Sequence, residues 1–292
     1  MESVSNTLKE SQATGPLGRS LTSRKETHNC QTCGCPFEVM VVVRNGVEGP
    51  LYTDCQQCRQ KRQEAEARAK AIKELEEARE KQRDFWLDEC NIPCLFVNKT
   101  LENFERKLQP KAFDVVKGYS DKSIVLLSPD VYGVGKTHLV VALANHILRS
   151  EESARLLSNS LRIVRRSCPV YFTTEAQLLA RIRTTYHRQE GNTGGETEEG
   201  IYQKLESYNL LILDDVGKVH PRDFSFLQGV YYRVIDSRYV NEQPVILTTN
   251  LGYVELEEHI GGASADRLRE MCGENFVVMK GKSYRRRELS KT

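Results

Sequence analysis

The segment SPDVYGVGKTHLV, residues 128–140, constrains the fold more than any other, because it ends as a phosphate-binding loop does. In the pattern G-x-x-x-x-G-K-[ST], backbone N–H groups turn onto phosphate oxygens, a lysine reaches the terminal phosphates and a hydroxyl binds magnesium. The residues predicted to bind a nucleotide here are Gly133, Val134, Gly135, Lys136, Thr137 and His138. Asp130 replaces the first glycine of the pattern, and its charge is expected to weaken phosphate binding.

The segments around this loop predict an α/β fold. Residues 123–127 form a short apolar run typical of a buried strand, and residues 138–148 have the apolar spacing of a helix whose N-terminus would face the phosphates. Four further strands are expected in PVYFTT, LLILDDV, PVILTTN and FVVMKG, and helices near 136–149, 174–188, 224–240 and 252–260. This alternation predicts a five-stranded parallel sheet with helices on both faces. HRQEGNTGGETEEG, residues 187–200, is expected to be a surface loop.

Polar side chains end two of these strands. Asp214 is the expected magnesium partner together with Thr137, and Asp215 is expected to act as the general base that polarises the attacking water. Both carboxylates fall at the carboxyl end of a strand, where open parallel sheets bind ligands. Asn250 could orient the water, or could serve only the turn that follows its strand. Aspartate is one methylene shorter than the usual glutamate base, so slow turnover is expected.

Arg267 is placed on a predicted helix at some distance from the loop, in GGASADRLREM. An arginine that one subunit offers to the nucleotide of its neighbour neutralises charge that develops during phosphoryl transfer. A surface salt bridge with a neighbouring glutamate is the alternative role for this side chain.

The cysteines point to a metal site. The chain has nine of them, an odd number, with no apolar run of about 18 residues and no apolar core in the opening MESVSNTLKE, which favours a cytosolic protein with reduced thiols. Two C-x-x-C pairs have the spacing of a tetrahedral zinc site, and their members are Cys30, Cys33, Cys55 and Cys58. Cys35 could replace one ligand, and a turn is expected at Asn45 and Gly46. So small a unit would draw its folding energy from the metal.

Taken in order, these motifs resemble the DnaC/IstB-type helicase-loader branch of the AAA+ ATPases, from about Asn91 to Arg287. NIPCLFVNKTLENFE is similar to the opening segment of the family, with Ile92, Pro93 and Phe104 at its hallmark positions. The phosphate loop in GVGKTHLVVALANHI, the double aspartate in LLILDDVGK and the sensor asparagine in VILTTN also match. DRLRE followed by KSYRRRE resembles the arginine-finger helix and terminal tail of the family.

The resemblance implies an AAA+ P-loop NTPase core that uses ATP and Mg²⁺. It implies these roles: phosphate and magnesium binding by Lys136 and Thr137, metal binding by Asp214, catalysis by Asp215, first sensor Asn250, finger Arg267 and second-sensor candidate Arg285. It also implies self-association into a homo-oligomer on single-stranded DNA and delivery of a replicative hexameric helicase. The Zn²⁺ unit resembles the N-terminal modules of some loaders, which implies contact with the helicase, although ribbons of this kind also bind nucleic acid.

Four segments are therefore expected along the chain: a disordered tail over 1–26, a zinc-ribbon-like module over 27–59, a charged connector helix over 60–90 and an AAA+ ATPase domain over 91–292. The connector RQKRQEAEARAKAIKELEEAREKQRDFW has opposite charges four residues apart, as in a solvated helix that serves as a semi-rigid spacer.

DNA contacts are expected only from local clusters, because the net charge is +2. One cluster combines cations with an aromatic ring able to stack on a base, and its members are Arg181, Arg183, Tyr186, His187 and Arg188. A solvated helix face is the alternative. A second cluster at Arg162, Arg165 and Arg166, and the run Arg285 to Arg287, are equally ambiguous.

Two rivals to helicase loading stay open. One is an IstB-like regulator of transposition that assembles on duplex DNA, and the other is a protein that binds ATP as a switch without hydrolysing it. The motif set fits a small-molecule kinase less well.

Overall fold

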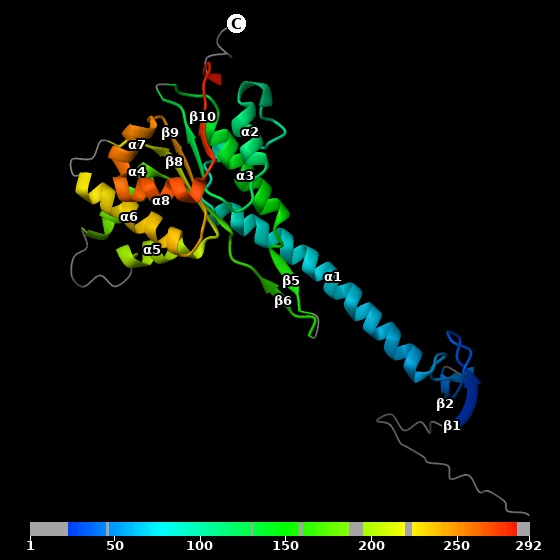
Figure 1. Ribbon diagram of the computed structural model, residues 1–292. Coiled ribbons are helices and arrows are strands. Elements are labelled where there is room, and N and C mark those ends of the chain that lie inside the picture. Colours follow the sequence, from blue (N-terminus) through cyan, green and yellow to red (C-terminus); the bar gives the residue numbers. More distant parts are fainter. Residues whose placement is uncertain are drawn as a thin grey trace, which may run out of the picture. The chain divides into compact units, whose positions relative to one another are not determined.

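The computed structural model describes residues 23–44, 47–129, 131–157, 160–186, 195–219 and 224–284 (Figure 1). Asp130, the predicted turn at Asn45 and Gly46, and the cations His187, Arg188 and Arg285 to Arg287 lie outside the described residues. The chain divides into two compact units, one reaching to Glu74 and the other containing the residues from Leu75 onward, apart from a short segment at 158–161.

The N-terminal unit contains a three-stranded antiparallel sheet in the order β1-β2-β3. Its strands are β1 (Ser23–Asn29), β2 (Pro36–Arg44) and β3 (Val47–Pro50), so that β1 begins inside the segment predicted to be disordered. Val39 and Val41 alternate along β2 and are buried, together with Cys30. This apolar core is small for a unit that has to fold.

Helix α1 (Gln56–Glu89) begins in the N-terminal unit and continues into the second one. In the second unit Arg79 Nε donates to the Ala154 carbonyl at 2.9 Å, and Trp86, which is 1% exposed, donates to the Arg166 carbonyl at 3.0 Å. These contacts pack the end of α1 on a hairpin of β5 (Ala154–Leu156) and β6 (Ile163–Arg165). The helix is therefore not solvated along its whole length, because Ala78, Gln82 and Trp86 share one face.

The second unit is built on a parallel sheet in the order β10-β4-β9-β8-β7, which confirms the predicted five-stranded fold. Its strands are β4 (Ile124–Leu127), β7 (Val170–Thr174), β8 (Leu210–Val216), β9 (Val245–Thr249) and β10 (Phe276–Val278). Most residues of the four longer strands are buried, as expected for a parallel sheet covered on both faces.

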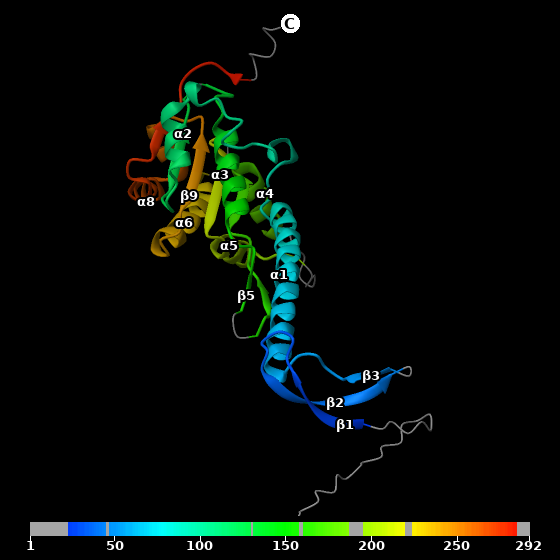
Figure 2. The ribbon, with the colours of Figure 1, turned by 90° about the vertical axis from the view of Figure 1, so that its right-hand side faces the viewer.

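Helices cover both faces of this sheet, with α2 and α3 on one side and α6, α7 and α8 on the other (Figures 1 and 2). The helical elements are η1 (Cys94–Phe96), η2 (Arg106–Leu108), α2 (Pro110–Lys117), α3 (Lys136–Ser150), α4 (Glu175–Tyr186), α5 (Glu198–Ser207), α6 (Phe224–Val240), α7 (Tyr253–Ile260) and α8 (Gly262–Cys272). None of the helices in the described ranges combines the length and the apolar character needed to cross a membrane.

Helix α5 corrects one expectation. Its first residues, Glu198 to Gly200, were expected in a surface loop but form a helical turn. The Thr197 side chain accepts a hydrogen bond from the Gly200 N–H at 3.0 Å, which caps the helix. The acidic residues after this cap are favourable at a helix N-terminus, so their polarity does not indicate a loop.

Candidate nucleotide and metal sites

A cleft of about 840 Å³ opens in the second unit beside the ends of β8 and β9 and the start of α3. The predicted residues that line it are Gly133, Val134, Gly135, Lys136, Thr137, His138, Asp215 and Asn250. Residues that the sequence did not single out also line it, among them Lys99, Tyr132, Lys218 and Tyr284.

The phosphate loop depends on its glycines. Gly133 and Gly135 have φ angles of 75° and 100°, in the region that residues with a side chain avoid. A Cβ added at Gly135 would lie 2.7 Å from Cε2 of Phe104, which itself is buried. Phe104, one of the hallmark positions of the opening segment, thus packs on the loop that precedes α3 and helps to hold it in place.

Lys136 and Asn250 both form hydrogen bonds with Ser128, the residue that follows β4. Lys136 Nζ donates to Ser128 Oγ, and the Lys136 side chain is buried. Asn250 Nδ2 donates to the Val131 carbonyl at 2.6 Å and to the Ser128 carbonyl at 3.2 Å. The amide therefore links the end of β9 to the phosphate loop.

His138 and Tyr284 close the other side of the loop. His138 Nε2 lies 2.8 Å from Asn103 Oδ1 and 3.1 Å from the Thr100 carbonyl, and burial lowers the pKa of the ring. The Tyr284 N–H donates to the Gly133 carbonyl at 2.8 Å. Tyr284 lies in KSYRRRE, whose sequence gave no sign of this backbone contact.

Thr137 and Asp214 form the expected magnesium pair. Thr137 Oγ1 donates to Asp214 Oδ2 at 2.9 Å, and Thr248 Oγ1 donates to Asp214 Oδ1 at 2.6 Å. Burial raises the pKa of Asp214 to about 6, against the hydrogen bonds from the two threonines. A hydroxyl and a carboxylate side by side are the oxygen ligands that Mg²⁺ prefers, so these residues fit the ion.

The raised pKa of Asp214 predicts a link between stability and pH. A carboxyl whose folded-state pKa is raised favours folding below its unfolded value, about pH 4, and loses that contribution as the pH rises through about 6. In Asp214→Asn the neutral amide removes this cost and keeps an oxygen acceptor. We expect thermal denaturation without magnesium at pH 8 to show Asp214→Asn more stable than wild type by roughly 1–3 kcal/mol. The gain should vanish near about pH 4, and an equal gain at both pH values would contradict the burial cost.

Asp215 is turned into the cleft by an irregularity in the sheet. The pairing of β8 with β9 shifts register between Leu213 and Val216, and Asp215 has a φ of 58°. Its N–H donates to Thr248 Oγ1 at 3.0 Å. Bulges next to active sites commonly re-aim a side chain, and here the bulge separates the two aspartates, one buried and one facing the cleft.

Arg267 lies on α8 and does not line the cleft of its own chain. Its Nε is 2.9 Å from Asp236 Oδ1, and its guanidinium lies over the Tyr232 ring at 5.1 Å. The side chain therefore makes a surface salt bridge. Its partner is Asp236 of α6, whereas the sequence suggested a neighbouring glutamate.

The predicted DNA cluster is divided in the structure. Arg181 Nε is 2.6 Å from Glu196 Oε2, and the Arg181 side chain is only 23% exposed. Arg183 lies over the Phe226 ring at 5.3 Å, and Tyr186, which is exposed, meets the same ring edge-on. In the second cluster, Arg166 pairs with Glu151 at 3.1 Å, and Arg162 and Arg165 are exposed.

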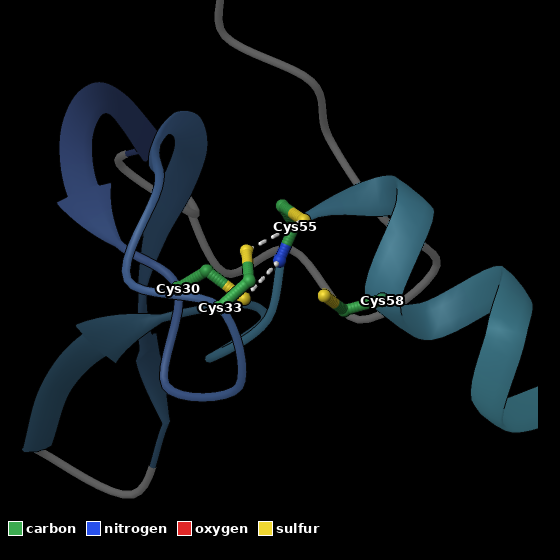
Figure 3. Close-up of side chains that lie close together, drawn as sticks. All are labelled: Cys30, Cys33, Cys55 and Cys58. Carbon is green, nitrogen blue, oxygen red and sulfur yellow. Dashed lines mark hydrogen bonds between the residues drawn. The ribbon is translucent and has the colours of Figure 1, made fainter.

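The four predicted metal ligands converge in the N-terminal unit, with Cys58 in the first turn of α1 (Figure 3). The sulfur atoms of Cys30, Cys33, Cys55 and Cys58 all lie within 4.8 Å of one another, and those of Cys33 and Cys55 are 3.8 Å apart. Four sulfurs around a tetrahedral zinc, each about 2.3 Å from the metal, lie about 3.8 Å from one another. The cluster therefore fits Zn²⁺, and Cys35 is not part of it.

The surroundings of the cluster also suit a metal site. The Cys55 N–H donates to Cys30 Sγ at 3.3 Å, a contact that favours a thiolate. Buried Asp54 accepts hydrogen bonds from Thr32 Oγ1 at 2.8 Å and pairs with Arg62 at 2.9 Å. These bonds tie the first cysteine loop to α1, as supporting contacts around metal ligands do.

Comparison with known proteins assigns this chain to a protein family. The family model of the "IstB-like ATP binding protein" matches residues 53–292. The replicative helicase loader DnaC of Escherichia coli strain K12 is 22% identical over 230 residues, which cover 77% of this chain and 83% of DnaC. The phage-like element PBSX protein XkdC of Bacillus subtilis is 25% identical over 182 residues, 59% of this chain and 56% of XkdC, so the match spans little more than half of that relative.

Among solved structures, the crystal structure of the DnaC helicase loader has a TM-score of 0.48 and 21% sequence identity, and covers 64% of this chain and 100% of that one. A score at this level adds nothing to the assignment, which rests on the family match and the motifs. The match covers most of the chain, includes the whole cleft and confirms the resemblance predicted from the motifs. The chain therefore belongs to the family of IstB-like ATP-binding proteins, and it is an AAA+ ATPase.

Proposed function

We propose that this protein is an ATP-dependent loader that places a replicative hexameric DNA helicase onto single-stranded DNA. It would act in the cytoplasm as a homo-oligomer, with slow ATP hydrolysis that DNA or the helicase stimulates. The observation that carries the proposal is a cleft lined by the loop, its lysine and hydroxyl and Asp215, with Asp214 bonded to that hydroxyl, but with no arginine of the described residues in its lining.

The chemistry of this cleft follows from its side chains. Lys136 would neutralise charge on the terminal phosphates, and Thr137 and Asp214 would hold Mg²⁺, which supplies further charge neutralisation when bound. Asp215 would accept the proton of the attacking water, and Asn250 would orient that water. These roles account for hydrolysis of ATP to ADP and phosphate.

The absence of an arginine among the described residues that line the cleft favours assembly. Arg267 lies outside the cleft of its own chain and is held by Asp236, so a role in hydrolysis requires the nucleotide of a neighbouring subunit. Supply of an arginine in trans is a recurring way to stimulate slow nucleotide hydrolysis. An isolated chain would hydrolyse slowly, and an assembled one faster.

The helicase and DNA roles are supported by similarity and by surface chemistry. A helicase loader matches over 77% of this chain, which favours loading over the regulation of transposition. Arg183 and exposed Tyr186 beside Phe226 combine a cation with aromatic faces, as surfaces that bind single strands do. Arg181 is less suited to phosphate binding, because Glu196 already pairs with it.

A helicase-transfer assay tests the proposal. Purified protein is mixed with the replicative helicase of its host and a single-stranded circle that carries an annealed oligonucleotide, and release of the oligonucleotide is followed. We expect unwinding that requires this protein and ATP, and ATP hydrolysis that rises with single strands more than with duplex. Binding to duplex in preference, with no helicase transfer, would instead support a regulator of transposition.

A matched pair of variants separates DNA contact from folding. Tyr186→Ala removes the exposed ring, whereas Phe85→Ala on α1 removes an exposed ring outside this cluster. We expect weaker single-strand binding only in the first. Equal loss in both would point to a general effect on the fold.

A further inference from the structure

A charge pair inside the cleft is not explained by nucleotide binding. Lys218 Nζ lies 2.5 Å from Asp215 Oδ2, and both side chains line the cleft with the phosphate loop. The two side chains are 48% and 31% exposed, so the pair faces solvent in the space that a nucleotide would enter. The expected general base thus already has a cation on one of its oxygens.

The backbone on both sides of Lys218 is held by a buried carboxylate. Glu175, at the start of α4, accepts hydrogen bonds from the N–H groups of Gly217 at 3.0 Å and Val219 at 3.1 Å. It also accepts from Tyr231 Oη at 2.8 Å and lies 2.6 Å from His259 Nε2, and it is 1% exposed. Burial alone would raise the pKa of Glu175, but these partners, led by His259, lower it.

This arrangement fixes where the lysine stem begins. The amides of Gly217 and Val219 are the immediate neighbours of Lys218, and the Asp215 N–H is held by Thr248. Only the four-carbon stem of the lysine is free to rotate between the aspartate and the rest of the cleft.

We propose that Lys218 is a positioning residue that restrains Asp215 through their ion pair, and that the restraint persists when ATP binds to an isolated chain. The inference rests on the proposed role of Asp215. In hydrolysis the water oxygen bonds to phosphorus, the bond to the ADP oxygen breaks with its electron pair leaving on ADP, and the water proton passes to Asp215. While the ammonium holds Asp215 Oδ2, the carboxylate cannot turn that oxygen to the attacking water, so the pair keeps basal hydrolysis slow.

The effect of the restraint should be modest. Solvent-exposed ion pairs contribute little, because water screens them and both side chains lose freedom. Removing the ammonium should therefore raise the basal rate by about three- to tenfold. A lysine needed only to bind phosphate would behave differently, because its loss would raise KM.

The experiment is steady-state ATP hydrolysis by the full chain without DNA. Lys218→Met keeps the aliphatic stem and removes the charge, and we expect kcat to rise about three- to tenfold with KM changed by less than about twofold. Lys218→Arg keeps the charge and should stay close to wild type. Lys111→Met, at an exposed position of α2, is the control for loss of a surface lysine.

The dependence on Asp215 gives the decisive comparison. In an Asp215→Asn background, Lys218→Met should produce no acceleration. An acceleration that persists there, an unchanged or lower kcat in Lys218→Met, or no turnover in wild type and variant alike would each overturn the restraint. Helicase transfer is measured on the same preparations, so that a raised kcat without transfer rejects only the loader, and transfer with an unchanged kcat rejects only the restraint.

Discussion

Lys136→Ala is expected to remove ATP hydrolysis almost completely, with a loss of roughly 10²- to 10³-fold in kcat. The lysine begins α3 and lines the cleft, where its ammonium is expected to neutralise charge on the terminal phosphates. Hydrolysis is measured with saturating ATP in the absence of DNA, with single strands and with duplex. The fold should survive, because the change removes a buried charge and leaves the apolar side of α3 intact.

Mixing experiments test whether ATP hydrolysis requires residues from two neighbouring subunits. Lys136→Ala carries an intact Arg267, and Arg267→Ala carries an intact phosphate loop. If the arginine acts on the nucleotide of a neighbouring subunit, mixtures of the two inactive variants should recover part of the activity. Wild-type hydrolysis by Lys136→Ala alone would refute the assignment of this cleft.

Removal of the metal is expected to unfold the N-terminal unit and spare the second one. The buried core around Val39 and Val41 is small, and a structural zinc contributes an apparent 10–16 kcal/mol, on the order of the stability of a whole domain. After treatment with a strong chelator, trypsin should cut rapidly within residues 23–62 while the fragment that contains the nucleotide cleft persists. The measurement is limited proteolysis with mass analysis of the fragments.

Two cysteine variants give the matched comparison. Cys33→Ser removes a sulfur of the cluster, whereas Cys35→Ser removes an exposed thiol two residues away that lies outside it. Zinc bound per chain, measured by atomic spectroscopy, should fall in the first and remain at one in the second. Equal zinc content in the two variants would mean that the ligand set differs from the four cysteines.

The strands of the sheet and the phosphate loop could be predicted from the sequence, because their signals are local. Strand β8 consists of an apolar run that ends in two aspartates, and the loop is a fixed spacing of glycine, lysine and threonine. The hairpin of β5 and β6 was missed because its residues mix apolar and basic side chains without a clear period. Helix α5 was missed because a polar first turn resembles a loop.

The parts of the site that escaped prediction depend on long-range contacts. Glu175 bonds to His259, which is 84 residues away in the chain, and to the amides beside Lys218 more than 40 residues away. The ion pair of Lys218 with Asp215 is local, but it needs a bulge and a positive φ that no residue pattern reveals. Arg181 is part of the cluster expected to bind DNA, and its pairing with Glu196 could not be foreseen because Glu196 comes from a separate segment.

The order of the strands bears on when this ATPase first becomes able to bind its nucleotide during synthesis. Strand β4, which leads into the phosphate loop, pairs with β9 and β10, so that Val125 faces Leu247 on one side and Phe276 on the other. Both partners are translated more than 100 residues after it, and non-local pairing of this kind is slow. A ribosome-bound chain therefore exposes β4 without either neighbour while more than 100 further residues are translated, and the sheet edge beside the phosphate loop is complete only after β9 and β10 have been made.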